Sequence, residues 1–394
     1  MKTIMILGAG VFQVAAIRKA VDLGYRVISV DYIPGNIGHR DAHQYVNAST
    51  TDARAVLAAA RENRIDGIFT MASDIALPTV ASVARELRLP GPGEELVRIL
   101  TNKTLFRPFQ LSLGLDTPAS IEFGNFEQAR ANWQGGPIVT KPAISSGSRG
   151  VRRLEKLDSN CRPLFEQACQ YSYNGKACIE EFIPGDDVSV EGFIHDGTVQ
   201  HAFITNKYVR GFAVLGHEMP YKGADEQRDE ILRQIQTVID KTGYRAGPFD
   251  ADFRINADRI VMLEITPRLG GNGMPLLAEL VHGVKLVERS IMLAAGDEPG
   301  PTTLEHTGKT VPGATVLLHS NQTGTVTSVA STREMLARLS GVESLCLDLK
   351  AGQKVERFEH GGHIFGYCVL KLTNEAHFDG ISRQVFDALK LEVT

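Results

Sequence analysis

Short apolar runs alternate with helical patterns through the first hundred residues, and this alternation restricts the fold more than any other feature of the chain. The strand-like and helical segments follow one another in the order Thr3–Leu7, Val11–Leu23, Arg26–Asp31, Thr51–Asn63, Gly67–Thr70 and Ala76–Leu87. Continuous apolar runs of this length are typical of strands buried on both faces. Strand–helix alternation with short connections builds βαβ units, so the sequence predicts a parallel, doubly wound sheet.

A glycine pair after the first strand raises the question of dinucleotide binding. Gly8 and Gly10 open the turn, and Asp31 closes the second strand where a ribose carboxylate would lie. Gln13 occupies the position of the third glycine of that motif, where a side chain obstructs close helix–strand contact. The pattern favours a tight turn in an α/β scaffold, with a nicotinamide dehydrogenase as the competing hypothesis.

Two stretches rich in proline and glycine divide the rest of the chain. Leu89–Gly93 follows the first sheet, and Gly296–Pro301 follows a helix expected over Met274–Ala295. The last segment alternates strands and helices without βαβ order and is predicted to be a small α+β piece. The predicted domains are residues 1–100, 101–300 and 301–394.

Charge and cysteine usage exclude several classes of partner. The 394 residues contain 42 Lys and Arg against 46 Asp and Glu, a net charge of −4, which argues against nucleic acid or an anionic membrane as the main partner. The 5 cysteines form no CxxC pair and are interpreted as reduced core residues. No stretch approaches the ~20 apolar residues of a membrane span, and the N-terminal apolar run is too short for a signal peptide. The sequence predicts a cytoplasmic protein with small-molecule partners.

A lysine at the end of an apolar strand, followed by a loop of small residues, predicts a polyphosphate site. Lys141 ends the strand Ile138–Lys141, and the serine/glycine loop Ser145–Gly150 follows Pro142. A fixed ammonium supplies the charge, while backbone N–H groups can close over phosphate oxygens. The lysine precedes the glycines, so this is not a Walker loop. A surface hairpin beside an exposed lysine is the alternative.

Acidic residues alternate with valines on the strand that follows. After Glu180 and Glu181, period-two spacing puts Asp187, Ser189 and Glu191 on one face. Such a strand suits an acceptor for an exocyclic amine and a carboxylate for a ribose. A solvated edge strand is the alternative.

A hairpin is expected to bring two carboxylates together. Asp252 and Glu264 fall side by side on adjacent strands. Facing carboxylates repel unless a cation lies between them, and hard oxygen ligands favour Mg²⁺, which usually bridges carboxylate and phosphate. Arg268 follows and can bind an anion through two hydrogen bonds. A surface ladder of ion pairs is the alternative.

Taken together and in this order, these segments resemble the ATP-grasp superfamily, and within it the carboxylate–amine ligases. The resemblance covers about residues 1–300. It rests on Lys103, Lys141-Pro142 with its loop, Glu180–Ile183, Asp187 and Asp252…Glu264–Arg268. It implies an ATP-grasp fold of the α/β class (α+β in part), with an N-terminal Rossmann-like domain, a lid over about residues 115–185 and a small C-terminal α+β subdomain.

The resemblance also implies roles for individual residues, with ATP and Mg²⁺ as cofactors. The residues implied to bind ATP are Lys103, Lys141, Ser146, Gly147, Glu180, Glu181, Ile183 and Asp187. The residues implied to hold magnesium are Asp252, Glu264 and Thr266, the last standing where the family usually has Asn. The residues expected around the substrate are Asp74, Arg268, Gly270, Gly271 and Asn272.

The implied reaction couples a carboxylic acid to an amine. Attack of the carboxylate on the γ-phosphate gives an acyl phosphate, and the amine then displaces phosphate. Arg268 would hold the acid or its acyl phosphate. Lys207 could neutralise the γ-phosphoryl group or bind the substrate, with a plain surface residue as the alternative. His217 could accept the proton of the incoming ammonium, although a core or loop histidine is the favoured interpretation. The expected function is an ATP-dependent ligase for a small carboxylic acid, taken to be an amino acid, that releases ADP and phosphate.

Two readings compete with this function on the same fold. One is a carboxylase that uses bicarbonate, and the other is a nucleotide-binding module that has lost catalysis, which Thr266 suggests. Residues 302–394 are expected to form either a lid over the substrate or the face of a homodimer.

Overall fold

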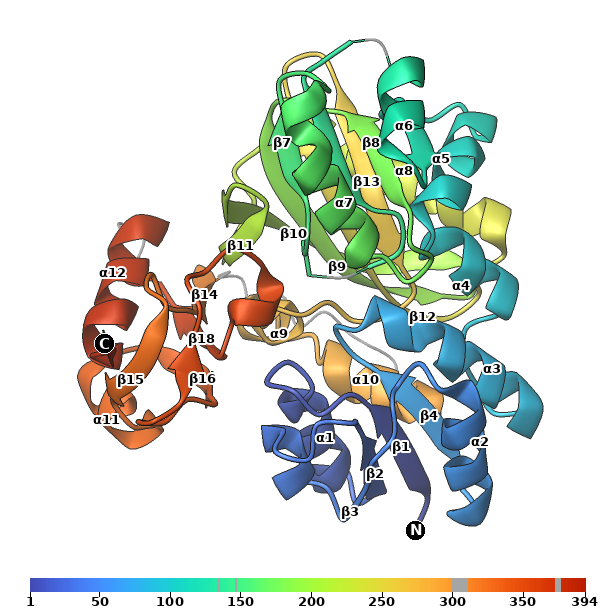
Figure 1. Ribbon diagram of the computed structural model, residues 1–394. Coiled ribbons are helices and arrows are strands. Elements are labelled where there is room, and N and C mark those ends of the chain that lie inside the picture. Colours follow the sequence, from blue (N-terminus) through green and yellow to red (C-terminus); the bar gives the residue numbers. More distant parts are fainter. Residues whose placement is uncertain (134, 146, 300–310, 373–376) are drawn as a thin grey trace.

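Three lobes meet around a common centre in the computed structural model (Figure 1). The structure describes residues 1–133, 135–145, 147–299, 311–372 and 377–394. The N-terminal lobe is drawn in blue, the upper lobe from teal to green, and the C-terminal lobe in red. The predicted boundary Gly296–Pro301 lies partly outside the described residues.

The N-terminal lobe is a four-stranded parallel sheet in the order β3-β2-β1-β4, with helices on both faces. Its elements are β1 (Thr3–Leu7), α1 (Val14–Asp22), β2 (Arg26–Val30), β3 (Gln44–Val46), α2 (Ala53–Glu62), β4 (Gly67–Thr70), α3 (Leu77–Leu87) and, from later in the chain, α10 (Leu286–Ala294). Alternate residues of β1 explain the two covered faces. Ile4 and Ile6 pack in one core with α1 and α10, and Met5 and Leu7 pack in another with α2 and α3. The predicted doubly wound sheet is confirmed.

The upper lobe is a four-stranded antiparallel sheet in the order β5-β8-β6-β7. Its elements are β5 (Ser120–Phe123), α6 (Phe126–Asn132), β6 (Ile138–Pro142), β7 (Arg152–Leu154), α7 (Arg162–Gln170) and β8 (Ala177–Glu181). Phe126 of α6 and Phe165 of α7 pack edge to face at 5.7 Å over the buried Ile138 and Ile179. This small core holds β6 and β8 together, and with them Lys141 and Glu180.

An eight-stranded antiparallel sheet forms the centre of the molecule, in the order β13-β12-β9-β10-β11-β14-β18-β16. Its strands are β9 (Asp186–His195), β10 (Thr198–Arg210), β11 (Ala213–Met219), β12 (Gly247–Ile255), β13 (Ile260–Thr266), β14 (Gly313–Leu318), β16 (Val342–Leu347) and β18 (Gly366–Lys371). The helices α4 (Glu94–Leu100), α5 (Lys103–Ser112) and α8 (Asp225–Thr242) pack against its β12–β13 end. Because β11 pairs with β14, the sheet continues without a break into the C-terminal lobe.

The C-terminal lobe completes its core with short elements around that sheet extension. They are β15 (Gly324–Ser328), α11 (Thr332–Arg338), β17 (Lys354–Val355), α12 (Phe378–Leu389) and β19 (Glu392–Val393), with β15 central in a three-stranded sheet. Phe378 of α12 stacks on Tyr208 of β10 at 4.0 Å. The lobe is therefore fixed to the central sheet by side chains as well as by strand pairing.

One expectation about an element was wrong, and one hairpin was missed. The helix expected over Met274–Ala295 is two helices, α9 (Met274–His282) and α10, because Gly283 adopts φ 73° and ends the first one. The hairpin β10–β11, which carries the longest strand of the central sheet, lies in a stretch where the sequence pattern predicted no element.

The domain limits near residues 100 and 300 stay a proposal. The helix α10 belongs to the second predicted domain by sequence and packs on the N-terminal sheet, and the central sheet crosses the second limit. Within the described ranges, none of the helices has the length and apolarity that a membrane span requires.

The close packing around Gly192 in the central sheet predicts that adding one methyl group there lowers the stability of the protein. A Cβ there would lie 2.3 Å from the Phe249 ring and 2.4 Å from the His201 carbonyl oxygen, so Gly192→Ala must displace a strand. We expect a loss of about 3 kcal/mol in the free energy of unfolding, measured by urea denaturation. Gly380→Ala, within α12 and without neighbours within 4 Å, is the control and should be neutral or stabilising by up to ~1 kcal/mol. Equal effects of the two changes would contradict the described packing.

Candidate active site

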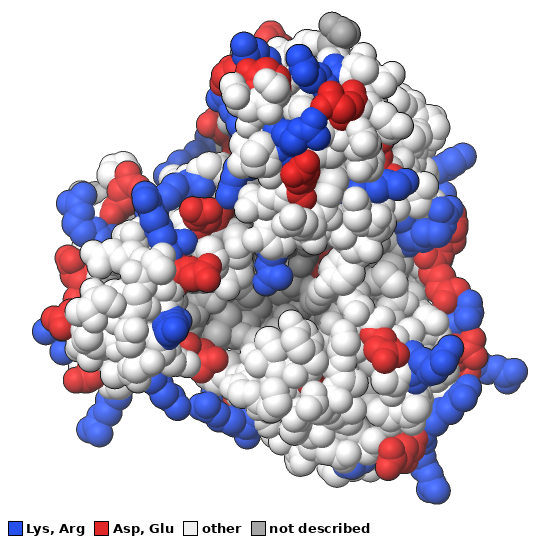
Figure 2. Space-filling view, in the orientation of Figure 1, with Lys and Arg blue, Asp and Glu red and all other residues white. Residues whose placement is uncertain are grey.

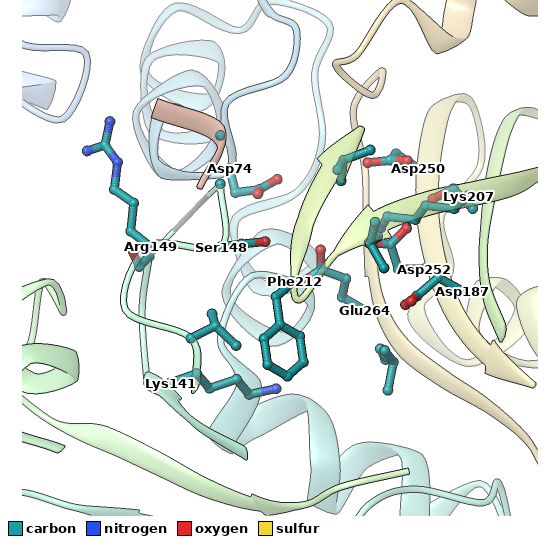
Figure 3. Close-up of a pocket in the computed structure, with 18 of the residues that line it drawn as sticks. Asp74, Lys141, Ser148, Arg149, Asp187, Lys207, Phe212, Asp250, Asp252 and Glu264 are labelled. Carbon is teal, nitrogen blue, oxygen red and sulfur yellow. The ribbon is translucent and has the colours of Figure 1, made fainter. Parts of the chain in front are cut away.

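A cavity of about 380 Å³ lies where the three lobes meet. Figure 2 shows the face of the molecule hollowed at this centre. Residues from all three lobes and from the central sheet line the cavity, including Asp74 of the N-terminal lobe, Lys141 of the upper lobe, Asp252 of the central sheet and Gly361 of the C-terminal lobe. The cavity contains most of the site residues that the sequence predicted (Figure 3).

A buried carboxylate fixes the lysine at the end of β6. The Glu180 carboxylate accepts hydrogen bonds from Arg107 Nε at 3.1 Å, Arg107 Nη2 at 3.3 Å and Ser120 Oγ at 3.1 Å, and it pairs with Lys141. Burial raises the pKa of Glu180, but Arg107 and Lys141 lower it more, to about 2. The carboxylate is therefore ionised and holds Lys141 against the cavity wall.

This network changes the interpretation of Glu180. The resemblance implied that its carboxylate accepts from the adenine amine, whereas here it is surrounded by Arg107, Lys141 and Ser120. Burial lowers the pKa of Lys141, and Glu180 opposes that shift. Sequence reasoning missed Arg107, although a charged residue between the apolar Phe106 and Phe109 of a helix was a signal that could have found it.

Asp252 and Glu264 are direct partners in the pairing of β12 with β13, and both line the cavity. Each carboxylate faces a lysine: Lys207 Nζ donates to Asp252 Oδ2 at 2.5 Å, and Lys103 Nζ lies 3.5 Å from Glu264 Oε2. Ser189 Oγ also donates to Asp252. The pair that sequence reasoning placed side by side is therefore together at the cavity wall, with cationic groups around it.

The donor set fits a divalent cation held through two carboxylates. Within the described residues, the structure has no group of three or more His, Cys, Asp or Glu side chains that could hold a metal ion. Mg²⁺ is usually bound through one or two carboxylates together with substrate phosphates and water, so Asp252 and Glu264 suffice for that mode. They do not form a closed metal site of the protein alone.

Two predicted residues lie away from this arrangement. Thr266 is only 4% exposed, its Oγ1 lies 3.5 Å from the Asp250 carbonyl oxygen, and it is not among the residues that line the cavity. His217 is completely buried, and its Nδ1 lies 3.0 Å from Thr205 Oγ1. Burial lowers the pKa of His217 well below 6.5, followed by the effect of Lys207. Neither side chain reaches the cavity in this structure, because both are directed into the sheet packing.

Arg268 joins the N-terminal lobe to the central sheet. Its guanidinium donates to Asp74 Oδ1, at 2.7 Å from Nε and 2.5 Å from Nη2, and its Nη1 pairs with Asp250. Glu191 lies beside Asp250 and accepts the Gly270 N–H through both oxygens, at 3.1 and 3.0 Å. Burial, then the charge of Asp250, raises the pKa of Glu191, and burial raises the pKa of Asp250 to about 6. At this end of the cavity, two acids pair with one guanidinium, and a third acid is buried beside Asp250.

The turn after Arg268 closes the same end. Gly271 and Asn272 line the cavity, and Gly270 is packed so closely on Glu191 that a Cβ would lie 2.5 Å from Oε2. Asn272 adopts φ 61°, in the left-handed region where Asn is more often found than most residues. Sequence reasoning placed these residues near the substrate but missed Asp250 as a second partner of Arg268.

The residues implied to bind the adenosine part lie along β8 and the start of β9. Ile183 and Asp187 line the cavity, and Asp187 pairs with Arg254 at 3.0 Å. The Glu181 N–H donates to the Ala119 carbonyl oxygen, so this N–H is not free to donate to a nucleotide in this structure. Of the serine/glycine loop, Gly147 and Ser148 line the cavity, whereas Ser146 lies outside the described residues.

A side chain of the protein itself occupies the space beside Gly8 and Gly10 in the N-terminal lobe. The Gln13 side chain lies against Gly8, where a Cβ would lie 3.0 Å from Gln13 Cδ, and its Nε2 donates to the Met71 carbonyl oxygen at 2.6 Å. Asp31 accepts the Ala9 N–H at 3.1 Å. This arrangement supports the interpretation of Gly8 and Gly10 as a tight turn.

Comparison with known proteins decides the family. Residues 134–275, which contain β6 to β13 with Asp252 and Glu264, match the ATP-grasp domain. This part of the chain is an ATP-grasp domain.

Similarity to relatives and solved structures covers most of the chain. It is 26% identical over 338 residues to an uncharacterised protein of Sinorhizobium fredii, covering 82% of this chain and 68% of that one. It is 26% identical over 326 residues to phosphoribosylamine–glycine ligase of Lactococcus lactis, covering 77% of each chain. The L-amino acid ligase of Bacillus licheniformis superposes with a TM-score of 0.83 at 20% identity, covering 100% of this chain and 99% of that one, a likeness that shows the fold.

These comparisons confirm the predicted superfamily, the fold class and the enzyme class of ATP-dependent ligases. The roles of individual ATP-grasp residues stay predictions. The structure brings Lys103, Lys141, Asp187, Lys207, Asp252 and Glu264 together at one cavity, as the sequence led us to expect.

The Glu180 network predicts a large cost for removing one of its cations. Arg107→Met leaves a carboxylate that is only 3% exposed with one cation fewer, and we expect a loss of about 3 kcal/mol in the free energy of unfolding. Arg98→Met, which breaks an exposed pair with Glu95 at 2.7 Å, is the control and should cost less than ~1 kcal/mol. Urea denaturation of both variants measures the difference, and similar losses would show that Glu180 is not held as described.

Proposed function

We propose that this chain is an ATP-dependent ligase that activates a small carboxylic acid as an acyl phosphate and couples it to an amine, releasing ADP and phosphate. The observation that carries the proposal is the opposition of Asp252 and Glu264 across paired strands, with Lys103 and Lys207 beside them and Lys141 in the same cavity. Such a set neutralises a nucleotide phosphate chain and positions it, which is most of what phosphoryl transfer requires of a protein.

The family assignment supports distinct roles for the cationic residues. Lys141, fixed by Glu180, and Lys103 would contact the phosphates of ATP, while Asp252 and Glu264 would hold Mg²⁺. When bound, Mg²⁺ would neutralise phosphate charge. Lys207, which contacts Asp252 in this structure, would neutralise the transferred phosphoryl group. Ile183 and Asp187 would contact the adenosine part.

The reaction proceeds through two substitutions. A carboxylate oxygen of the acid attacks the γ-phosphorus, the bond from that phosphorus to the β–γ bridging oxygen breaks, and ADP leaves. The neutral amine then attacks the acyl carbon, the bond to phosphate breaks, and the amine proton is lost to solvent or to phosphate. The protein chiefly orients the reactants and excludes water from the acyl phosphate.

The charges around Arg268 support an amino acid as the substrate. A free acid would meet one guanidinium already paired with Asp74 and Asp250, with Glu191 behind them. A zwitterion fits this mixture better than a simple anion, because its ammonium group can approach the acids while its carboxylate shares Arg268. Phe12 and Met274 add apolar walls to the same cavity.

The activation step can be tested by trapping. Hydroxylamine added with MgATP and amino acids should yield hydroxamates, because it attacks the acyl phosphate in place of the amine. Lys141→Ala and Glu264→Ala should each lower this rate at least ~100-fold, since each removes an electrostatic contact to the phosphates. Lys176→Ala, in an exposed pair with Glu122 on the upper lobe, is the matched control and should retain activity. Full activity of both active-site variants would remove these residues from the site.

The substrate class gives a separate test. Asp74→Asn should raise the KM for an amino acid about tenfold and leave the KM for ATP within twofold, because Asp74 lies at the substrate end. An acid of the same shape without the amino group should be a poor substrate of the wild-type enzyme and should be insensitive to this change. ADP release measures both quantities, and replacing the amine by bicarbonate tests the carboxylase alternative in the same assay. An equal preference for both acids would contradict the amino-acid assignment.

A further inference from the structure

In the part of the chain that the structure describes, the C-terminal lobe reaches the cavity through the segment Phe358–His363, which we call the C-terminal loop. Gly361 and Gly362 of this loop line the cavity together with Gly147, Ser148 and Arg149 of the serine/glycine loop. In Figure 3, a short reddish piece of C-terminal ribbon lies beside the ribbon that carries Ser148 and Arg149. The two loops are more than 200 residues apart in the sequence.

Three separate contacts join the C-terminal loop to the serine/glycine loop and the strand that follows it. The Gly361 N–H donates to the Gly147 carbonyl oxygen at 2.8 Å. Arg152 Nη2, at the start of β7, donates to Glu359 Oε2 at 3.1 Å. Arg149 packs so closely against Gly362 that a Cβ there would lie 2.8 Å from its Nη2.

The C-terminal loop is itself held by the central sheet. Phe358 stacks on His319 at 4.1 Å, and its N–H donates to the Ser320 carbonyl oxygen at 2.8 Å. The guanidinium of Arg210, at the end of β10, lies 5.9 Å from the centre of the Phe358 ring. The loop is therefore a fixed surface, whereas the serine/glycine loop belongs to a lobe with its own small core.

We propose that the C-terminal loop positions the serine/glycine loop over the nucleotide phosphates, with Glu359 and Gly361 as positioning residues that do not touch the substrates' reacting atoms. The inference rests on the proposed ATP binding and assigns a role to the C-terminal lobe. A loop that must stay closed during acyl phosphate formation needs a partner outside its own lobe, and the three contacts provide one.

Small residues on both sides make the approach possible. A Cβ on Gly361 would lie 3.2 Å from the Gly147 carbonyl oxygen and 3.3 Å from Gly147 Cα. Gly361 is not among the residues with positive φ, so alanine there adds no backbone strain of its own. Gly361→Ala therefore tests the contact between the loops separately from the folding of the C-terminal lobe.

Tryptic cleavage after Arg149, quantified by mass spectrometry, reports directly on closure of the serine/glycine loop. We expect saturating MgADP to slow this cleavage in the wild-type protein. In the presence of MgADP, Gly361→Ala and Glu359→Arg should each raise the rate of cleavage after Arg149 by about 3–10-fold over the wild type. Gly361→Ala separates the two loops, and Glu359→Arg replaces the attraction to Arg152 by a repulsion. Uncoupled ATP hydrolysis should rise in the same variants, since water then reaches the site.

Exchanging the charges of Arg152 and Glu359 distinguishes a positioning role of the C-terminal loop from a simple loss of its structure. Arg152→Glu combined with Glu359→Arg restores an ion pair and should return protection at Arg149 to within about twofold of the wild type. Glu343→Arg is the control, because Glu343 forms an exposed pair with Lys371 at 3.8 Å on the same lobe, away from the cavity. It should leave protection unchanged, and all variants should keep the wild-type Tm without nucleotide.

Calorimetry of MgADP binding to the wild type distinguishes the two ways of failing. The positioning role is overturned, and the proposed function stands, in either of two cases in which MgADP binds. In the first, MgADP protects Arg149 from cleavage as well in the variants as in the wild type. In the second, MgADP does not protect Arg149 even in the wild type. If MgADP does not bind at all, both are overturned.

Discussion

The opposition of two carboxylates on paired strands is the constraint on which the rest of the site depends. Asp252 and Glu264 are direct neighbours across β12 and β13, and like charges at that separation destabilise a sheet unless cations compensate them. Lys207 and Lys103 provide that compensation in this structure. In the proposed function, the two carboxylates would hold a divalent ion and the two lysines would contact phosphate oxygens.

Each lobe contributes a different part of the chemistry around that pair. The upper lobe supplies Lys141, held in place by Glu180 and Arg107, and the N-terminal lobe supplies Asp74, which is tied to Arg268. The central sheet extends through β11 and β14 into the C-terminal lobe, and the C-terminal loop of that lobe lines the same cavity. The proposed reaction therefore depends on contacts between lobes more than on any single motif.

Much of this arrangement could be predicted from the sequence because it follows from local periodicity. Period-two spacing fixes which faces carry Asp252 and Glu264, and the apolar run before Lys141 fixes the strand that ends there. What could not be predicted depends on packing between distant segments. The partners of Glu180 and Arg268 and the contact of Gly361 with Gly147 are set by how distant segments meet, and the burial of Thr266 is set by packing within the central sheet. The break at Gly283 was visible as a glycine, but a continuous apolar pattern on both sides concealed it.

The effect of Mg²⁺ on ADP affinity tests the central claim most directly. If Asp252 and Glu264 hold the cation against the phosphates, titration calorimetry should show that Mg²⁺ tightens ADP binding at least ~10-fold in the wild-type protein. The same titration of the Asp252→Asn, Glu264→Gln double variant should show no such gain, because the carboxylates that bind the ion are gone. An equal gain in the two proteins would place the cation elsewhere and contradict the account given for this cavity.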